Sequence, residues 1–73
     1  MNMEEYIENP LWPILVETVH MNVMYPYHKI YTQSVFLSER PDASPEDLAL
    51  GLDISLGEAL VILYELKIEK EKK

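Results

Sequence analysis

Apolar residues in the second half of the chain recur at helical spacing and are separated by residues typical of helix starts and turns. The pattern is clearest over 44–66, SPEDLALGLDISLGEALVILYEL. Ser44 is the expected N-cap of a short helix, with Pro45 at its first position and Asp47 placed for a capping box. The apolar spacing predicts that this helix continues to Leu52.

A second helix is expected directly after this one. Ser55 is its expected N-cap, and Glu58, three residues on, is the expected capping-box partner. The apolar pattern then runs to Leu66 and reaches about residue 68. Residues 69–73 are expected to form a solvated tail, frayed at its end.

The first half of the chain predicts two further helices. Helical spacing in LVETVHMNVM predicts a helix over about 10–24, with Asn9 as N-cap and Pro26 ending it. Pro13 allows a later start at Trp12. Residues 27–39 permit another helix, although their Tyr, Thr, Val and Phe also fit a strand. Residues 1–8 are expected to form a frayed turn or a short helix.

The stretch 44–66 resembles the helix-turn-helix superfamily of transcription regulators, which includes winged-helix proteins. Asp53 stands where that family usually has a left-handed glycine, a conformation that Asp tolerates. Ala49 is small where the two helices would cross. The positions matching the family's shared core are Leu48, Leu52, Ile54, Ala59 and Ile62. The resemblance implies an all-α bundle of three to four helices in a single domain, 1–73.

Two departures argue against the DNA-binding role that this family implies. No alternating strands follow the last helix, so we expect the wing to be absent. The residues that would face the major groove are Leu56, Gly57, Leu60, Val61 and Tyr64. None of these side chains can form the bidentate hydrogen bonds that read base edges. The surface that would read DNA therefore has the composition of a packing surface.

The second helix of the pair is apolar on two sides. At about 100° per residue, one stripe comprises Ala59, Ile62, Leu63 and Leu66, which we expect to pack on the preceding helix. The other stripe comprises Leu60, Val61, Tyr64 and Ile68. It must be covered by the N-terminal helix, by another copy of the chain or by a different protein, since large exposed apolar patches are uncommon on monomers. The interface hypothesis places this second stripe, with Trp12, at a protein–protein contact.

Composition supports contact with protein rather than with nucleic acid. The 73 residues include 13 acidic and 6 basic side chains, giving a net charge of −7, which the phosphate backbone repels. A core of this size seldom supplies more than about 3–5 kcal/mol, and the chain has no cysteine for disulfides. Self-association is therefore expected. The lack of cysteine leans weakly toward a thermophilic source.

The candidate chemistry is sparse. His20 and Glu17 have metal-ligand spacing, but a zinc site needs three or four convergent ligands, so we expect no metal. There is no nucleophile motif or phosphate loop, so we expect no enzyme, no cofactor and no small-molecule substrate. The segment MYPYHKIY could form a stacking platform for single-stranded nucleic acid, although packed tyrosines explain it as well. With no signal peptide and no long apolar run, we expect a cytoplasmic protein without a membrane segment.

The leading hypothesis is a small acidic helix-turn-helix-like protein that acts through protein–protein contact, as a homodimer. The alternative is a DNA-binding regulator of the same class, contacting DNA through Ser55, Lys29 and Arg40. A third hypothesis is an acidic adaptor that docks on a basic partner. The acidic strip it would use comprises Glu58, Glu65 and Glu69.

Overall fold

The computed structural model describes residues 3–71 and is all-α over that range. The elements in chain order are α1 (Met3–Ile7), α2 (Trp12–His20), α3 (Tyr25–Tyr31), η1 (Thr32–Phe36), α4 (Leu37–Glu39), α5 (Pro45–Leu52) and α6 (Leu56–Glu71). No strand occurs between the first and last of these elements. The all-α fold class predicted from the sequence is therefore confirmed, and the strand alternative for 27–39 is wrong.

The start of α5 has the predicted capping box. The Asp47 backbone N–H donates to the Ser44 hydroxyl at 3.1 Å, and the Ser44 N–H donates to the Asp47 carboxylate at 3.0 Å. The helix ends at Asp53, which is left-handed as expected, with φ 57° and ψ 47°. The Ile54 N–H closes this end by donating to the Ala49 carbonyl at 3.0 Å.

The start of α6 follows the prediction only in part. The Ser55 hydroxyl accepts from the Glu58 backbone N–H at 3.0 Å, so Ser55 is the cap. The Glu58 carboxylate, however, bonds to other helices rather than completing a capping box. The helix also continues to Glu71, so residues 69–71 belong to it; residues 72–73 of the expected tail lie outside the described residues.

The first long helix is shorter than predicted. Instead of covering about 10–24, α2 starts at Trp12, the later of the two starts that the sequence allowed, and ends at His20. The Asn22 side chain accepts the Met24 backbone N–H at 2.9 Å, which turns the chain between α2 and α3. Pro26 then lies in the first turn of α3, where a missing N–H costs nothing, rather than ending the preceding helix.

The segments α3, η1 and α4 follow one another without a break in helical conformation from Tyr25 to Glu39. The middle segment, η1, is a π-helix. Thr32, at its start, is fully buried, and its hydroxyl donates to the His28 carbonyl at 2.7 Å. This internal bond allows a polar side chain to lie in the core.

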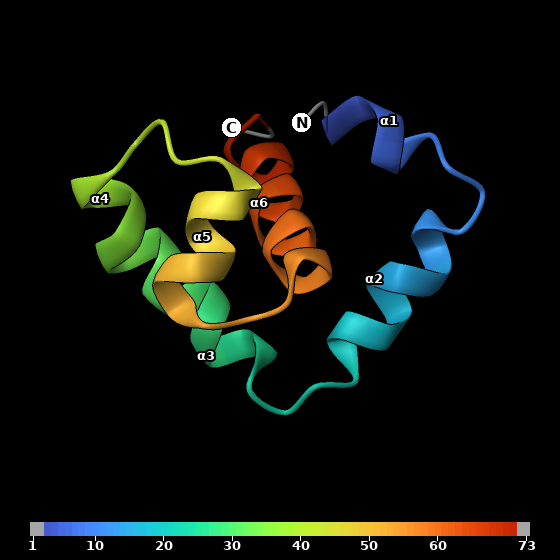
Figure 1. Cartoon of the computed structure of the whole chain (residues 1–73), viewed down its shortest axis with the longest axis horizontal. Helices are drawn as coiled ribbons and strands as arrows, with labels where there is room; N and C mark the ends of the chain where they lie inside the picture. The colour runs from blue at the N-terminus through green and yellow to red at the C-terminus, as the bar shows by residue number, and fades with distance from the viewer. Residues whose placement is uncertain (1–2, 72–73) are drawn as a thin grey trace.

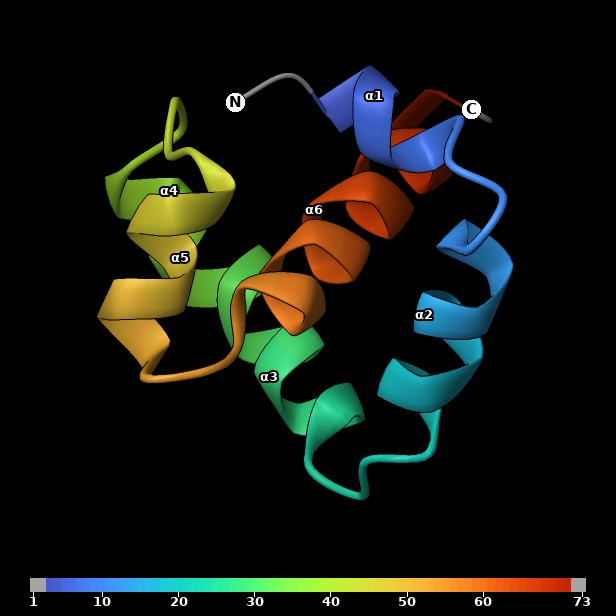
Figure 2. The same cartoon turned by 45° about the vertical axis from the view of Figure 1, so that its right-hand side comes forward.

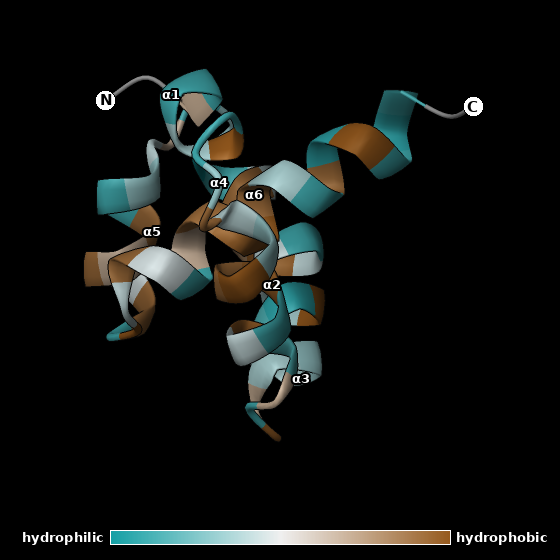
Figure 3. Cartoon of the chain, turned by 90° about the vertical axis from the view of Figure 1, so that its right-hand side faces the viewer, coloured by the Kyte–Doolittle hydropathy of each residue, from teal (hydrophilic) through white to brown (hydrophobic). Residues whose placement is uncertain are grey.

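The longest helix, α6, occupies the middle of the molecule. In Figures 1 and 2, α5 lies on one side of α6, α2 lies on the other, and α3 lies below it. Hydrophobic ribbon gathers in the middle of the molecule around α6 in Figure 3, and four consecutive residues of this helix, Ala59 to Ile62, are buried, which is typical of a helix buried on more than one side. The buried apolar side chains are Trp12, Val19, Tyr25, Phe36, Leu48, Ala59, Leu60, Val61 and Ile62. The core therefore draws on both halves of the chain.

Candidate protein–protein interface

The second apolar stripe of α6 is covered largely by the chain itself. Leu60 is 2% exposed and Val61 is fully buried, while Tyr64 and Ile68 are half-buried. Trp12, on α2, is also buried, and its ring meets that of Tyr64 edge to face at a centroid distance of 5.4 Å. Leu60, Val61 and Trp12 are therefore covered within the chain, because the N-terminal helices occupy that side of α6, one of the three covers that the sequence allowed.

The first polar residue of the acidic strip, Glu58, is buried and paired within the chain. Its side chain accepts from the Asn22 amide at 3.3 Å and lies 2.6 Å from Nδ1 of His28. Only 7% of the Glu58 side chain is exposed, against 25% for His28. A buried carboxylate needs such partners, because an unpaired one carries a large desolvation cost.

The other two carboxylates of the strip are engaged as well. Glu65 lies 2.8 Å from Nε2 of His20 and 3.4 Å from Nζ of Lys29, and it accepts the Tyr25 hydroxyl. Lys29 also pairs with Glu69. The three glutamates of the strip thus connect α6 to the turn after α2, to α2 and to α3, and an adaptor role would have to break these bonds.

The residues assigned to DNA contact do not form a free basic edge. Lys29 is half-buried between two glutamates of α6. The Arg40 guanidinium lies 3.7 Å from the Asp47 carboxylate and 5.6 Å from the centre of the Phe36 ring. Ser55 is exposed, but its hydroxyl caps α6. Lys29 and Arg40 thus each have an acidic partner in the same chain.

One apolar surface that the chain leaves open is formed by the outward side of α3 and the turn before it. We define the α3 face as Val23, Met24, Tyr27, Ile30 and Tyr31. Their exposed fractions are 81%, 49%, 66%, 60% and 50%. Val23 and Met24 lie in the turn, and at about 100° per residue Tyr27, Ile30 and Tyr31 fall within an arc of about 100° on the helix. Tyr25, His28 and Thr32 lie on the opposite side of the same helix, toward α6.

The electrostatic setting of the α3 face differs from that of the rest of the chain. None of the 13 acidic residues lies between Thr18 and Ser38. The nearest charged side chain, Lys29, is directed to the glutamates of α6. In a protein of net charge −7, this face therefore presents no carboxylate of its own to another acidic molecule that approaches it.

The spacing of apolar residues in the sequence indicates this face, but the sequence analysis concentrated on the stretch that resembles a helix-turn-helix. Val23, Tyr27 and Ile30 recur at spacings of four and three, the period of one helix side. The tyrosines of MYPYHKIY differ in their exposure. Tyr25 is buried with its hydroxyl on Glu65, whereas Tyr27 and Tyr31 are exposed.

The described residues offer little for metal or membrane chemistry. Within 3–71, no group of three or more His, Cys, Asp or Glu side chains is arranged to hold a metal ion. None of the helices in that range is both long and apolar enough to cross a membrane.

Comparison of the chain with protein-family models, with curated proteins and with solved structures found no significant match.

Proposed function

We propose that this protein acts through protein–protein contact, and that its α3 face pairs with the same face of a second copy. The observation that carries the proposal is the group of five exposed apolar side chains on α3 and the turn before it. Patches of this kind mark interaction sites on soluble proteins, and Tyr and Met are enriched at such contacts. The contact thus moves from α6, where the sequence alone placed it, to α3.

The distribution of charge is compatible with a contact between two copies at the α3 face. Two chains of net charge −7 repel each other, and that repulsion is smallest where both contribute a segment without carboxylates. A symmetric contact brings the face from Val23 to Tyr31 of each copy together. Burial of this face also supplies free energy that a short chain lacks from its own core.

We further propose that α5 and α6 are a helix-turn-helix pair used for packing rather than for reading DNA. The left-handed Asp53 and the short connection to Leu56 support this geometry. Burial of Leu60 and Val61, two of the positions that would face the major groove, supports the loss of the reading role. Titration of labelled duplex DNA at low salt is the test, and salt-sensitive binding at micromolar protein would overturn it.

The dimer is tested by measuring mass in solution with sedimentation equilibrium. We expect a concentration-dependent dimer for the native chain and a monomer for Ile30→Glu, because the new carboxylate lies in the contact. Leu50→Glu is the matched control: Leu50 is 84% exposed on α5, and the variant has the same change in charge. It should remain dimeric.

Salt gives an independent readout. Added NaCl screens the repulsion between two acidic chains, so the dimer should become tighter as ionic strength rises. A native chain that stays monomeric at millimolar concentration in high salt, or an equal loss of dimer in Leu50→Glu, would contradict the proposal.

A further inference from the structure

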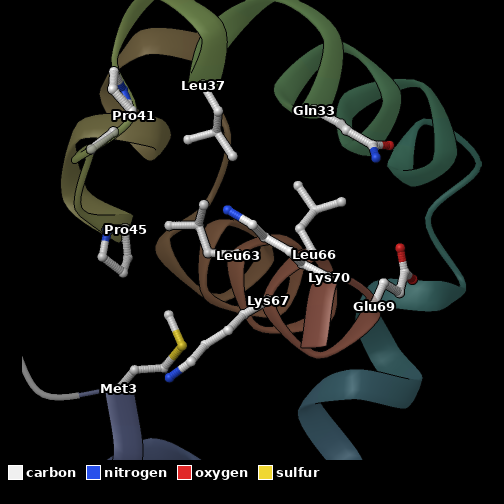
Figure 4. Close-up of a pocket in the computed structure, with 11 residues that line it drawn as sticks. Met3, Gln33, Leu37, Pro41, Pro45, Leu63, Leu66, Lys67, Glu69 and Lys70 are labelled. Atoms are coloured by element: carbon white, nitrogen blue, oxygen red, sulfur yellow. The ribbon is translucent and has the colours of Figure 1, made fainter. Parts of the chain in front are cut away.

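A hollow of about 630 Å³ lies beside the C-terminal half of α6, and none of the residues that line it belongs to α2. Its walls come from α1, the π-helical and α4 segments, the loop before α5, and the C-terminal half of α6. The apolar lining comprises Met3, Leu37, Pro41, Pro45, Leu63 and Leu66 (Figure 4). Sites for small molecules have this size range and this predominantly apolar lining.

The hollow lies beside the first apolar stripe of α6, which was expected to pack on the preceding helix. Ala59 and Ile62 of that stripe are completely buried. Leu63 and Leu66 are half-buried and face the hollow instead.

Two lysines give the hollow its charge. Lys67 and Lys70 line it, and in Figure 4 both side chains extend from α6 toward the hollow. No ion pair joins either ammonium group to a carboxylate in the part of the chain described, whereas Lys29 and Arg40 are both paired. Glu69, which also lines the hollow, is engaged by Lys29.

Apolar walls and free ammonium groups together define a ligand class. Long lysine side chains can lay their methylene stems along an apolar surface while the charged end stays at its edge. An ammonium at the edge of an apolar hollow favours an anion attached to a hydrocarbon chain, since each part then meets its complement. The protein has a net charge of −7, so it does not need these two lysines for solubility, and their position at the hollow calls for another explanation.

We propose that the hollow binds a linear aliphatic carboxylate. The hydrocarbon chain lies against Leu37, Leu63 and Leu66, and the carboxylate accepts hydrogen bonds from Lys67 and Lys70. This site is separate from the α3 face, so its occupancy does not depend on dimer formation.

The test is titration of the ¹⁵N-labelled full chain with dodecanoate below its micelle concentration, followed by NMR. We expect saturable shifts at the amides of residues 37, 43, 63 and 66. Dodecyltrimethylammonium, which has the same hydrocarbon chain and the opposite charge, should bind at least about tenfold more weakly. Lys67→Gln/Lys70→Gln should lose about tenfold in dodecanoate affinity, whereas Lys67→Arg/Lys70→Arg should retain it.

Two further measurements separate this site from general effects. Leu50→Glu also makes the net charge more negative, by one charge against two for Lys67→Gln/Lys70→Gln, but Leu50 does not line the hollow, and this variant should leave affinity unchanged. Equal affinity for the cationic amphiphile would overturn the proposal. Shifts confined to residues 23–31 would also overturn it, because the amphiphile would then bind the α3 face instead of the hollow. Concentration-dependent shifts at 37, 63 and 66 without ligand would also overturn it, because a second copy would then occupy the hollow.

Discussion

The two glycines of the chain are fixed by close contacts rather than by unusual backbone conformation. Neither has positive φ. A Cβ at Gly51 would lie 2.6 Å from Cε1 of the Phe36 ring, which is buried. A Cβ at Gly57 would lie 3.0 Å from Cδ1 of Leu15, the end of a flexible and only half-buried side chain. The absence of a side chain at Gly51 therefore lets α5 approach the helix that carries Phe36.

Gly51→Ala should destabilise the protein despite its better helix propensity. Ala gains about 1 kcal/mol over Gly within a helix, but overpacking a core costs about 1–3 kcal/mol. We expect a net loss of about 1 kcal/mol, measured by urea unfolding. Gly57→Ala is the matched control and should change stability by less than about 0.5 kcal/mol, since Leu15 can move. A stabilised Gly51→Ala variant would contradict the contact with Phe36.

Glu58 is the polar residue on which the packing of α6 depends most. Its carboxylate is the partner of both Asn22 and His28, on the turn after α2 and on α3. Glu58→Ala should lower the free energy of unfolding by about 1–3 kcal/mol, because it removes a buried carboxylate together with its contacts to Asn22 and His28.

Glu69→Ala provides the comparison for Glu58→Ala. The Glu69 side chain is 53% exposed, and its pair with Lys29 should contribute less than about 1 kcal/mol. Thermal and urea unfolding of both variants would measure the difference. An equal loss of unfolding free energy in the two variants would contradict the larger contribution assigned to the buried Glu58.

At the scale of the element, the start of α5 depends on a reciprocal cap whose strength varies with pH. The Ser44 backbone N–H holds the pKa of the Asp47 carboxyl below its ordinary value of 3.8; partial burial opposes this, and the Ser44 hydroxyl and the Arg40 guanidinium add to the lowering. A carboxyl with a depressed pKa stabilises the folded state above its ordinary pKa, and this contribution is lost as pH falls through the depressed value.

Asp47→Asn should therefore be less stable than the native chain near neutral pH, and the gap should close as pH falls below 3.8. Urea unfolding across pH 2–7 measures that gap. Asp42→Asn removes the same charge nearby from a carboxylate that has no hydrogen bond in the described range, and it should cost less at neutral pH. A gap for Asp47→Asn that does not change with pH would contradict the role assigned to its charge.

The elements that the sequence predicts correctly are those fixed by neighbouring residues. The Ser44–Asp47 box and the left-handed Asp53 involve residues at most a few positions apart, so residue types alone indicate them. The ends of α2 and α3 were misplaced because Pro26 fits two roles, following one helix or starting the next. Local pattern does not distinguish these roles.

The candidate site was harder to predict than the elements. Which side of α6 is covered depends on contacts such as His28 with Glu58, 30 positions apart in the chain. Both stripes of α6 are equally apolar in sequence, so nothing local indicates that Leu60 and Val61 are buried while Leu63 and Leu66 line a hollow. The α3 face was missed for the same reason, since its exposure follows from how α3 packs.

At the scale of the whole molecule, one central helix is shared by the two halves of a short chain. α5 packs on one side of α6, and the N-terminal helices α2 and α3 pack on other sides of it (Figures 1 and 2). The N-terminal part is held by aromatic packing and by the glutamates of α6. This division separates residues that stabilise the monomer from those available for association.

Tyr64→Glu and Ile30→Glu should consequently affect different properties: the first the stability of the monomer, the second the formation of the dimer. Tyr64 packs on Trp12, so a carboxylate there loses the aromatic contact and should destabilise the monomer by about 2 kcal/mol. Ile30 is 60% exposed, so Ile30→Glu should leave monomer stability within about 0.5 kcal/mol while abolishing the dimer. Chemical unfolding at low protein concentration and sedimentation at high concentration measure the two quantities separately. A fully stable Tyr64→Glu variant that fails to dimerise would return the interface to α6, because Tyr64 would then serve association rather than the core.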